Sequence, residues 1–177
     1  MALTDPVLLA QWDRERNGDL TPNDVTYGSR RKVWWRCEKG HSWQAQIKSR
    51  TLLGAGCPIC YNRAVASGVN DLATLRPDLA AQWDGEKNGE LTAEMVSAYS
   101  NRKVWWRCEK GHSWQAPVAA RTKRSSRCPY CTGRKVLAGY NDLATVEPFV
   151  AMQWHPALNG DLTPEQVTGG SRRYVWW

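Results

Sequence analysis

Residues 31–45 read RKVWWRCEKGHSWQA, and the same letters return without change at residues 102–116. The Val-Trp-Trp run near the start of this stretch favours a β-strand, and residues 42–47 can form a second strand beside it. The turn between the two strands carries Cys37 and His41. The stretch therefore predicts a β-hairpin whose turn presents two metal-binding side chains.

The hairpin belongs to a longer repeat that runs through the whole chain, with Trp12, Trp83 and Trp154 at equivalent positions. A third copy begins near Asn141 and stops at Trp177, before the position of its first cysteine. We therefore expect two zinc modules and a truncated third repeat without metal ligands, as in a piece of a longer array. The predicted boundaries are residues 1–69, 70–140 and 141–177.

Each unit opens with a short segment that starts with proline and ends with tryptophan. These segments are residues 6–12, 77–83 and 148–154. Proline at the first helical position and an apolar face predict a helix in each, and an Asn-Gly turn follows it. Thr21 and Thr163 each precede a proline and predict one-turn helices, with Thr163 and Gln166 matching a capping box.

The cysteines and histidines follow the pattern C-x3-H-x15-C-x2-C twice. Four such ligands complete the tetrahedral shell of a structural Zn²⁺ and leave no place for a catalytic water. All six cysteines and two of the three histidines fall into the two sets, which argues against a disulfide framework, chance spacing or a catalytic zinc. The predicted ligands of two structural zinc ions are Cys37, His41, Cys57 and Cys60, then Cys108, His112, Cys128 and Cys131.

The composition fits small units that are held together by metal. The 177 residues include eleven tryptophans and one phenylalanine. A unit of roughly 60 to 70 residues buries little surface by itself. We find no signal peptide and no stretch near the roughly 20 apolar residues of a membrane helix. We expect a cytoplasmic protein without membrane contact, where paired cysteines bind metal.

The positive charge is concentrated in the predicted zinc modules. The net charge is +7, and residues 28–63 and 99–135 hold most of the lysines and arginines, with Glu38 and Glu109 as the acids among them. Three thiolates and one Zn²⁺ leave one negative charge per site, so the modules stay basic. A basic face on a rigid module is typical of a phosphate binder, although cation–π pairing with tryptophan or a solvated surface are alternatives.

The paired tryptophans and the least similar segments have two interpretations each. Adjacent strand residues point to opposite faces, so one of Trp34 and Trp35 packs inward and the other can stack on a base or on a neighbouring unit.

Residues 46–56 and 117–127 differ most between units. We expect a variable loop there, with base reading as the alternative. His155 replaces the aspartate of the other units and is expected on a surface loop.

The motifs N-D-L-A-T, P-x-L-A-x-x-W, N-G-x-L-T-P, K-V-W-W-x-C, G-H-x-W and C-P-x-C resemble the probable zinc-ribbon or treble-clef zinc finger repeat family of bacteria and their phages. The resemblance covers both full units and the truncated third. It implies tandem α+β modules, zinc-stabilised hairpins with short helices, and nucleic-acid binding. The repeats are similar to those found beside some nuclease domains of the very-short-patch-repair type. Ala93 and the pair Ala98-Tyr99 depart from the pattern, which affects loop geometry and not the metal.

We interpret the chain as a modular, non-enzymatic nucleic-acid-binding protein, with DNA favoured over RNA. The alternatives are a protein–protein interaction array and an accessory targeting region of a nuclease, whose catalytic domain would lie outside this stretch. The predicted phosphate contacts are Arg30, Arg31, Lys32, Arg36, Arg50, Arg102, Lys103, Arg107 and Arg121.

Overall fold

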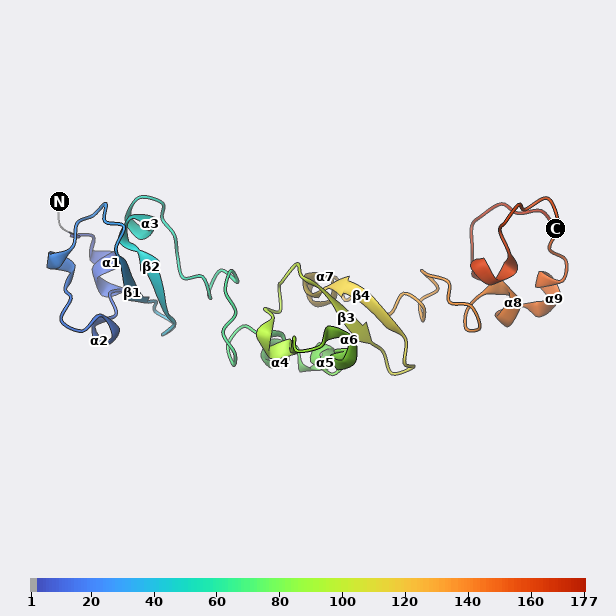
Figure 1. Ribbon diagram of the computed structural model, residues 1–177, viewed down its shortest axis with the longest axis horizontal. Coiled ribbons are helices and arrows are strands. Elements are labelled where there is room, and N and C mark those ends of the chain that lie inside the picture. Colours follow the sequence, from blue (N-terminus) through green and yellow to red (C-terminus); the bar gives the residue numbers. More distant parts are fainter. Residues whose placement is uncertain (1–2) are drawn as a thin grey trace.

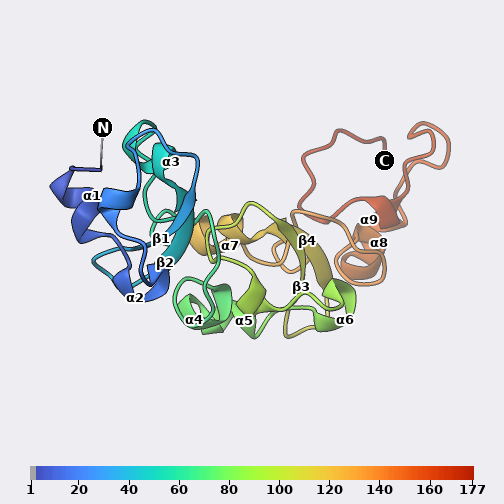
Figure 2. The ribbon, with the colours of Figure 1, turned by 60° about the vertical axis from the view of Figure 1, so that its left-hand side comes forward.

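The computed structural model describes residues 3–177, which form three modules in a row (Figure 1). A view turned by 60° keeps the same order (Figure 2). The first module contains α1 (Pro6–Ala10), α2 (Arg14–Asn17), η1 (Pro22–Asp24), β1 (Lys32–Arg36), β2 (Ser42–Gln46) and α3 (Ile47–Thr51). The second contains α4 (Leu72–Leu75), α5 (Pro77–Ala80), α6 (Gly85–Asn88), η2 (Ala93–Met95), β3 (Lys103–Arg107), β4 (Ser113–Pro117) and α7 (Val118–Arg124). The third contains α8 (Leu143–Val146), α9 (Pro148–Ala151) and η3 (Pro164–Gln166).

Each zinc module is built around one antiparallel hairpin. Strand β1 pairs with β2, and β3 pairs with β4 in the same register, which confirms the predicted hairpin. Trp35 lies opposite Trp43 in the first hairpin, and both are buried. Trp34 points to the other face and is half-buried. The second hairpin repeats this pattern, so the expected division of each tryptophan pair is confirmed.

The first helical segment packs on the hairpin through an aromatic contact. The rings of Trp12 and Trp35 meet edge to face with centroids 5.6 Å apart, and those of Trp83 and Trp106 are 5.8 Å apart. The backbone after α1 also bonds to β1, because the Arg36 amide donates to the carbonyl of Gln11. This aromatic contact is one part of a small core, which in the first module also contains Leu8, Val33, Trp43 and Ile47.

A short helix after this contact was not predicted. Asp13 is the N-cap of α2, and its carboxylate accepts a hydrogen bond from the Arg16 amide; Asp84 caps α6 in the same way. Asn17 ends α2, and its side-chain amide pairs with the backbone of Trp34 in both directions, at 2.8 Å each. Asn17 of the Asn-Gly dipeptide thus binds the backbone of β1, in addition to its place in the turn. Gly18 provides the positive φ of 57° that ends the helix.

The segments predicted as variable loops begin with helices, so this prediction was wrong in part. Helices α3 and α7 follow directly after the hairpin, and α7 is longer than α3. Ile47 and Val118 start these helices and are fully buried beneath them. Arg50 of α3 and Arg121 of α7 are buried as well, so these short helices are stabilised by packing rather than by length.

The third module keeps the fold of the opening segment. The capping box of Thr163 and Gln166 is present, as predicted, and a second one joins Thr21 and Asp24. The rings of Trp154 and Trp177 meet edge to face at 5.5 Å. His155 occupies the place of Asp13, where its Nδ1 accepts hydrogen bonds from the amides of residues 157 and 158.

The modules are joined by a hydrogen-bonded connection. The side-chain amide of Asn70 donates to the carbonyls of Ile59 and Ala64, while its own backbone carbonyl accepts from the Ala98 amide of the second module. Asn141 makes the equivalent side-chain bonds at the next connection, to Tyr130 and Lys135. No helix within residues 3–177 is long and apolar enough to cross a membrane.

Candidate zinc sites and basic surface

The first two ligands of each site lie at the hairpin turn. The Cys37 amide donates to the carbonyl of His41, and the Gly40 amide donates to the carbonyl of Cys37. Gly40 has a φ of 81° and Gly111 has the same value, a conformation that glycine adopts without strain. This tight knuckle turns the Cys37 sulfur and the His41 ring toward the same point.

The other two ligands lie on a second turn, after α3 or α7. The Tyr61 amide donates to the carbonyl of Cys57, and the Arg63 amide donates to that of Pro58, so the C-P-x-C turn folds back on itself. Cys57 is buried against the core, whereas Cys60 lies at the surface. The second site repeats this arrangement with Cys128 and Cys131. All eight predicted ligands are therefore brought together in two clusters.

The distances within each cluster match a tetrahedral zinc shell. A Zn²⁺ with Zn–S of about 2.3 Å and Zn–N of about 2.0 Å separates two sulfurs by about 3.8 Å and a sulfur from a nitrogen by about 3.5 Å. Cys37 Sγ lies 3.8 Å from Cys60 Sγ and 3.5 Å from His41 Nδ1. The corresponding distances in the second cluster are 3.8 and 3.6 Å. A disulfide would need about 2.0 Å. The clusters are Cys₃His zinc sites in which histidine binds through Nδ1.

The thiols need a cation to ionise together. Burial raises the pKa of Cys60, and the Cys57 and Cys37 sulfurs raise it further, to about 11. Burial likewise raises the pKa of Cys128 to about 11. For Cys37 burial also acts upward, but hydrogen bonds from the His41 and Lys39 amides outweigh it and hold its pKa below the ordinary value. A bound Zn²⁺ stabilises all three thiolates at once, which couples metal binding to folding.

Two predicted phosphate contacts are wrong, because Arg50 and Arg121 are buried. The Arg121 guanidinium lies 4.8 Å from the ring centre of Trp106 and 5.1 Å from that of Trp114. It also donates to Gln82 at 2.7 Å. Arg50 has the same aromatic neighbours in its own module and donates to the Gln11 side chain. These arginines lie behind the zinc site and stabilise the core through cation–π contacts.

Two further predicted contacts are already paired with acids. Arg107 donates to the buried carboxylate of Asp84 at 3.0 Å and to Glu86 at 2.5 Å. Arg36 makes equivalent pairs with Asp13 and Glu15. Both arginines are only half-exposed along their side chains. Their charge is therefore largely compensated within the module, which reduces what they can contribute to an anionic partner.

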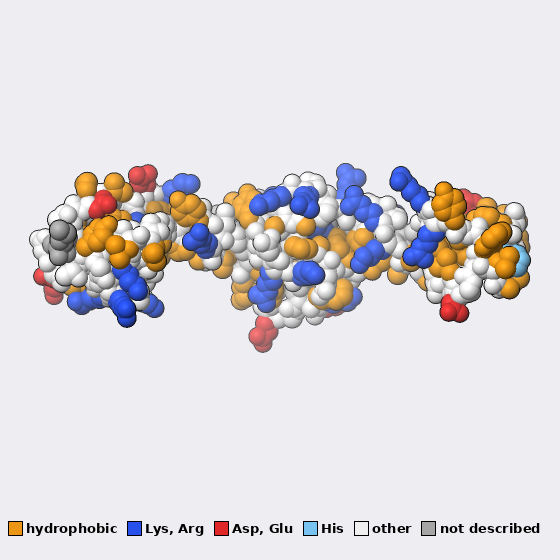
Figure 3. All heavy atoms as spheres, turned by 90° about the horizontal axis from the view of Figure 1, so that it is seen from above, with side chains coloured by type: hydrophobic (Ala, Val, Ile, Leu, Met, Phe, Trp, Pro, Cys, Tyr) orange, Lys and Arg blue, Asp and Glu red, His pale blue; other side chains and the backbone are white. Residues whose placement is uncertain are grey.

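The remaining predicted contacts form an exposed edge at the start of each hairpin. We call the residues Arg30, Arg31, Lys32, Arg102 and Lys103 the hairpin edge; all five are exposed. Within residues 3–177, none of the five has an acidic side chain within ion-pair distance. Lysine and arginine side chains spread over the faces of all three modules seen from above (Figure 3).

The outward tryptophans are covered by cations instead of being bare stacking platforms. The Arg16 guanidinium lies 4.6 Å from the ring centre of Trp34, and the Lys87 ammonium lies at the same distance from Trp105. Sequence reasoning did not identify these partners, because α2 and α6 were not predicted. A base could stack on these rings only after displacing the cation.

The fold and the sites together define a tandem zinc finger protein with treble-clef-like Cys₃His modules. Three segments match the family described as "Probable Treble clef zinc finger domain", at residues 8–63, 79–134 and 150–177. These segments cover most of the chain, which belongs to this family, as its motifs predicted.

One curated protein matches part of this chain at low sequence identity. Over 105 residues, 58% of this chain, the sequence is 25% identical to a protein of Escherichia phage T5 that is named "Putative endonuclease". The matching region spans 32% of that relative, or about a third of its length.

Proposed function

We propose that this chain binds nucleic acid, preferably DNA, through the hairpin edge of its zinc modules. The observation that carries the proposal is the position of Lys32 and Lys103, at the same point of two rigid hairpins and, among residues 3–177, without an acidic partner. Phosphates attract such unpaired cations, and the fixed scaffold reduces the entropy lost on binding. The family description and the name of the phage relative agree with this function.

The chain acts as a binding part rather than as a catalyst in this proposal. Within residues 3–177, the clusters able to hold a metal are the two Cys₃His sets, and their ligand shells are complete with zinc. A role as the targeting region of a nuclease is the second candidate, and the name of the phage T5 relative, "Putative endonuclease", favours it. In both cases, the modules supply contact with the nucleic acid.

A salt-dependent titration tests the proposal. The zinc-loaded chain is titrated with double-stranded and single-stranded DNA and RNA at two salt concentrations. If five exposed cations each neutralise one phosphate, affinity falls roughly 500-fold from about 50 mM to about 200 mM salt. An aromatic protein interface lacks this steep dependence. Absence of binding to all four ligands at low salt would exclude the proposed function.

A charge-matched pair of variants locates the contact. Lys32→Gln combined with Lys103→Gln removes two cations from the hairpin edge. Arg14→Gln combined with Arg124→Gln removes two exposed cations elsewhere. The first variant should lower affinity for DNA and reduce the salt slope by about two units, while the second should leave both nearly unchanged. Equal effects of the two variants would contradict the proposed position.

A further inference from the structure

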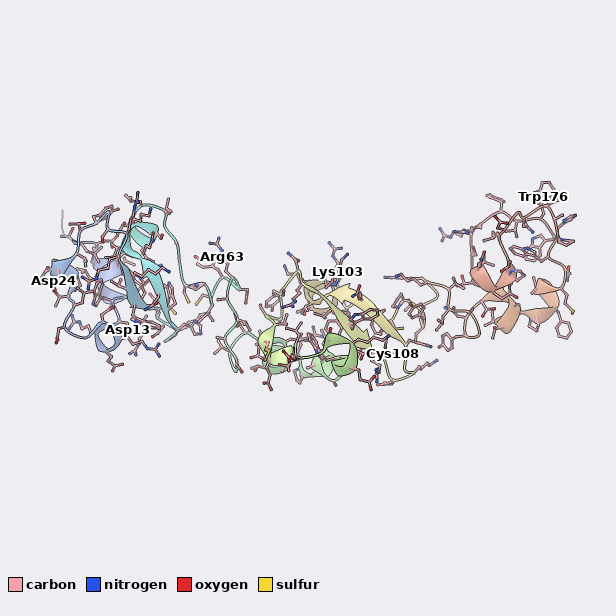
Figure 4. The ribbon with its side chains drawn as sticks, viewed as in Figure 1. Asp13, Asp24, Arg63, Lys103, Cys108 and Trp176 are labelled. Atoms are coloured by element: carbon pink, nitrogen blue, oxygen red, sulfur yellow. The ribbon has the colours of Figure 1, made fainter. Side chains whose placement is uncertain are left out.

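The connection between the first two modules borders an open cavity of about 350 Å³. One wall comes from the segment after the C-P-x-C turn of the first module, including Asn62 and Arg63. The other wall comes from the loop before β3, including Ser100, Asn101 and Arg102. Figure 4 shows Arg63 at this connection, between the two modules. The cavity is therefore shared between modules and does not belong to either zinc site.

The lining of the cavity has the chemistry of an anion site. The lining residues include two arginines, two asparagines and two serines, and none of them is acidic. Arg63 and Arg102 are exposed, and neither lies within ion-pair distance of an acid among residues 3–177. Guanidinium groups bind phosphate oxygens with two parallel hydrogen bonds, so a pair of them favours a phosphate group.

Both walls of the cavity are held in place. The Asn70 side chain bonds to the backbone of Ile59 and Ala64 beside the first wall. Its backbone carbonyl accepts from Ala98, and the Leu72 amide donates to Val96, both beside the second wall. The distance between the two walls is therefore restrained by hydrogen bonds and not set by a flexible linker. Walls held at a fixed separation reduce the entropy that is lost when the two arginines bind a shared anion.

The same charges recur at the next connection in the sequence. Arg134 holds the position of Arg63 in the second repeat, and Arg173 holds the position of Arg102 in the third. The Asn141 side chain repeats the hydrogen bonds of the Asn70 side chain there, to the carbonyls of Tyr130 and Lys135. The arginine pair thus follows the module connection rather than one local sequence.

From these observations we infer that the cavity between modules is a phosphate site, in which Arg63 of one module and Arg102 of the next hold one phosphodiester of a bound nucleic acid. This inference rests on the proposed function for the identity of the ligand. It extends that function by placing one contact between modules, where two neighbouring modules are needed to form it. The hairpin edge and this site share Arg102.

Mutual dependence of the two arginines tests the inference. Arg63→Gln and Arg102→Gln are each expected to weaken DNA binding roughly tenfold. The double variant should lose little more, and its salt slope should fall by about one unit, because both groups hold the same phosphate. Arg14→Gln on α2 is the charge-matched control and should combine additively with Arg63→Gln. All variants must retain two zinc ions per chain.

Inorganic phosphate provides a second measurement that does not depend on DNA. In a titration followed by NMR, the side-chain amides of Asn62 and Asn101 should shift in the wild type and not in the double variant. If DNA binds but both arginine variants behave like Arg14→Gln, the inference is overturned while the proposed function stands. If no nucleic acid binds, these phosphate-dependent shifts still support a phosphate site, and their absence overturns it.

Discussion

The side chain of Asn70 donates a hydrogen bond to the carbonyl of Ile59, at 3.1 Å, and so ties the connection between modules to the C-P-x-C turn of the first zinc site. Ile59 lies between the ligands Cys57 and Cys60. Because the Asn70 backbone carbonyl also accepts a bond from Ala98, one residue touches the metal-binding turn of one module and the core of the next. The metal-binding turn of the first module is therefore linked by hydrogen bonds, through Asn70, to the core of the second.

Replacing Asn70 by alanine should loosen the connection. The change leaves the Ile59 and Ala64 carbonyls and the Ala66 amide without this partner, at a cost of about 1–3 kcal/mol in the free energy of unfolding. Small-angle scattering and NMR relaxation should show independent motion of the first two modules. The exposed Asn23→Ala variant is the control. Unchanged relative motion in Asn70→Ala would show that other contacts hold the modules.

Removing one ligand should unfold one module and leave its neighbour folded. In Cys108→Ser, zinc content should fall from two ions per chain to one, because the two cores use separate residues. Cys37→Ala should remove the zinc ion of the first module and leave that of the second in place. Metal analysis and the NMR spectrum of each hairpin are the measurements. Loss of both zinc ions from either single variant would contradict separate folding.

Arg121 should matter for stability and not for binding anions. Arg121→Met removes the cation–π contacts to Trp106 and Trp114 and the bond to Gln82, which should destabilise the second module by about 2 kcal/mol. Thermal unfolding measures this loss. The salt slope for DNA should not change once zinc is fully bound. A lower slope at unchanged stability would restore Arg121 as a phosphate contact.

Asp84 should contribute stability across the neutral range of pH. Burial raises its pKa, but hydrogen bonds from Ser113 and the Lys87 amide, with the Arg107 charge, outweigh burial and hold the pKa below the ordinary value. A carboxylate with a lowered pKa in the folded state stabilises above its unfolded pKa, near about 3.9, and this stabilisation is lost as pH falls through the folded pKa.

The test for Asp84 compares melting temperatures at several values of pH. The difference between wild type and Asp84→Asn should stay constant from about pH 5 to about pH 8 and shrink only in acid. Glu90→Gln, at an exposed carboxylate of the same module, serves as the control. A difference that changes between neutral and mildly alkaline pH would indicate that another group is responsible.

The hairpins and the ligand sets could be predicted from the sequence because their signals are local. Strand residues on either side of a C-x3-H turn define the hairpin, and the repeated spacing identifies the metal. The burial of Arg121 could not be predicted in this way, since charged side chains are normally exposed and its aromatic partners lie on the two strands of the hairpin. Lys103, by contrast, is exposed, as charged side chains normally are.

The missed helices have a different explanation. Helix α2 has 4 residues and α7 has 7, which is too short for a periodic pattern to appear. Asp13 could have indicated α2, because aspartate is a preferred N-cap. The backbone pairing of Asn17 with Trp34 joins residues that are distant in sequence, and the dipeptide Asn-Gly indicates only the turn.

The hydrogen-bonded connections fix the spacing between neighbouring modules. Because Asn70 and Asn141 restrain each module against the previous one, every added repeat lengthens the row by one fixed step. The stretch of polymer that such a row can follow then grows in proportion to the number of copies, and each bound module raises the local concentration of the next. Copy number alone could therefore adjust how long and how tightly a strand is held, without changing any individual contact.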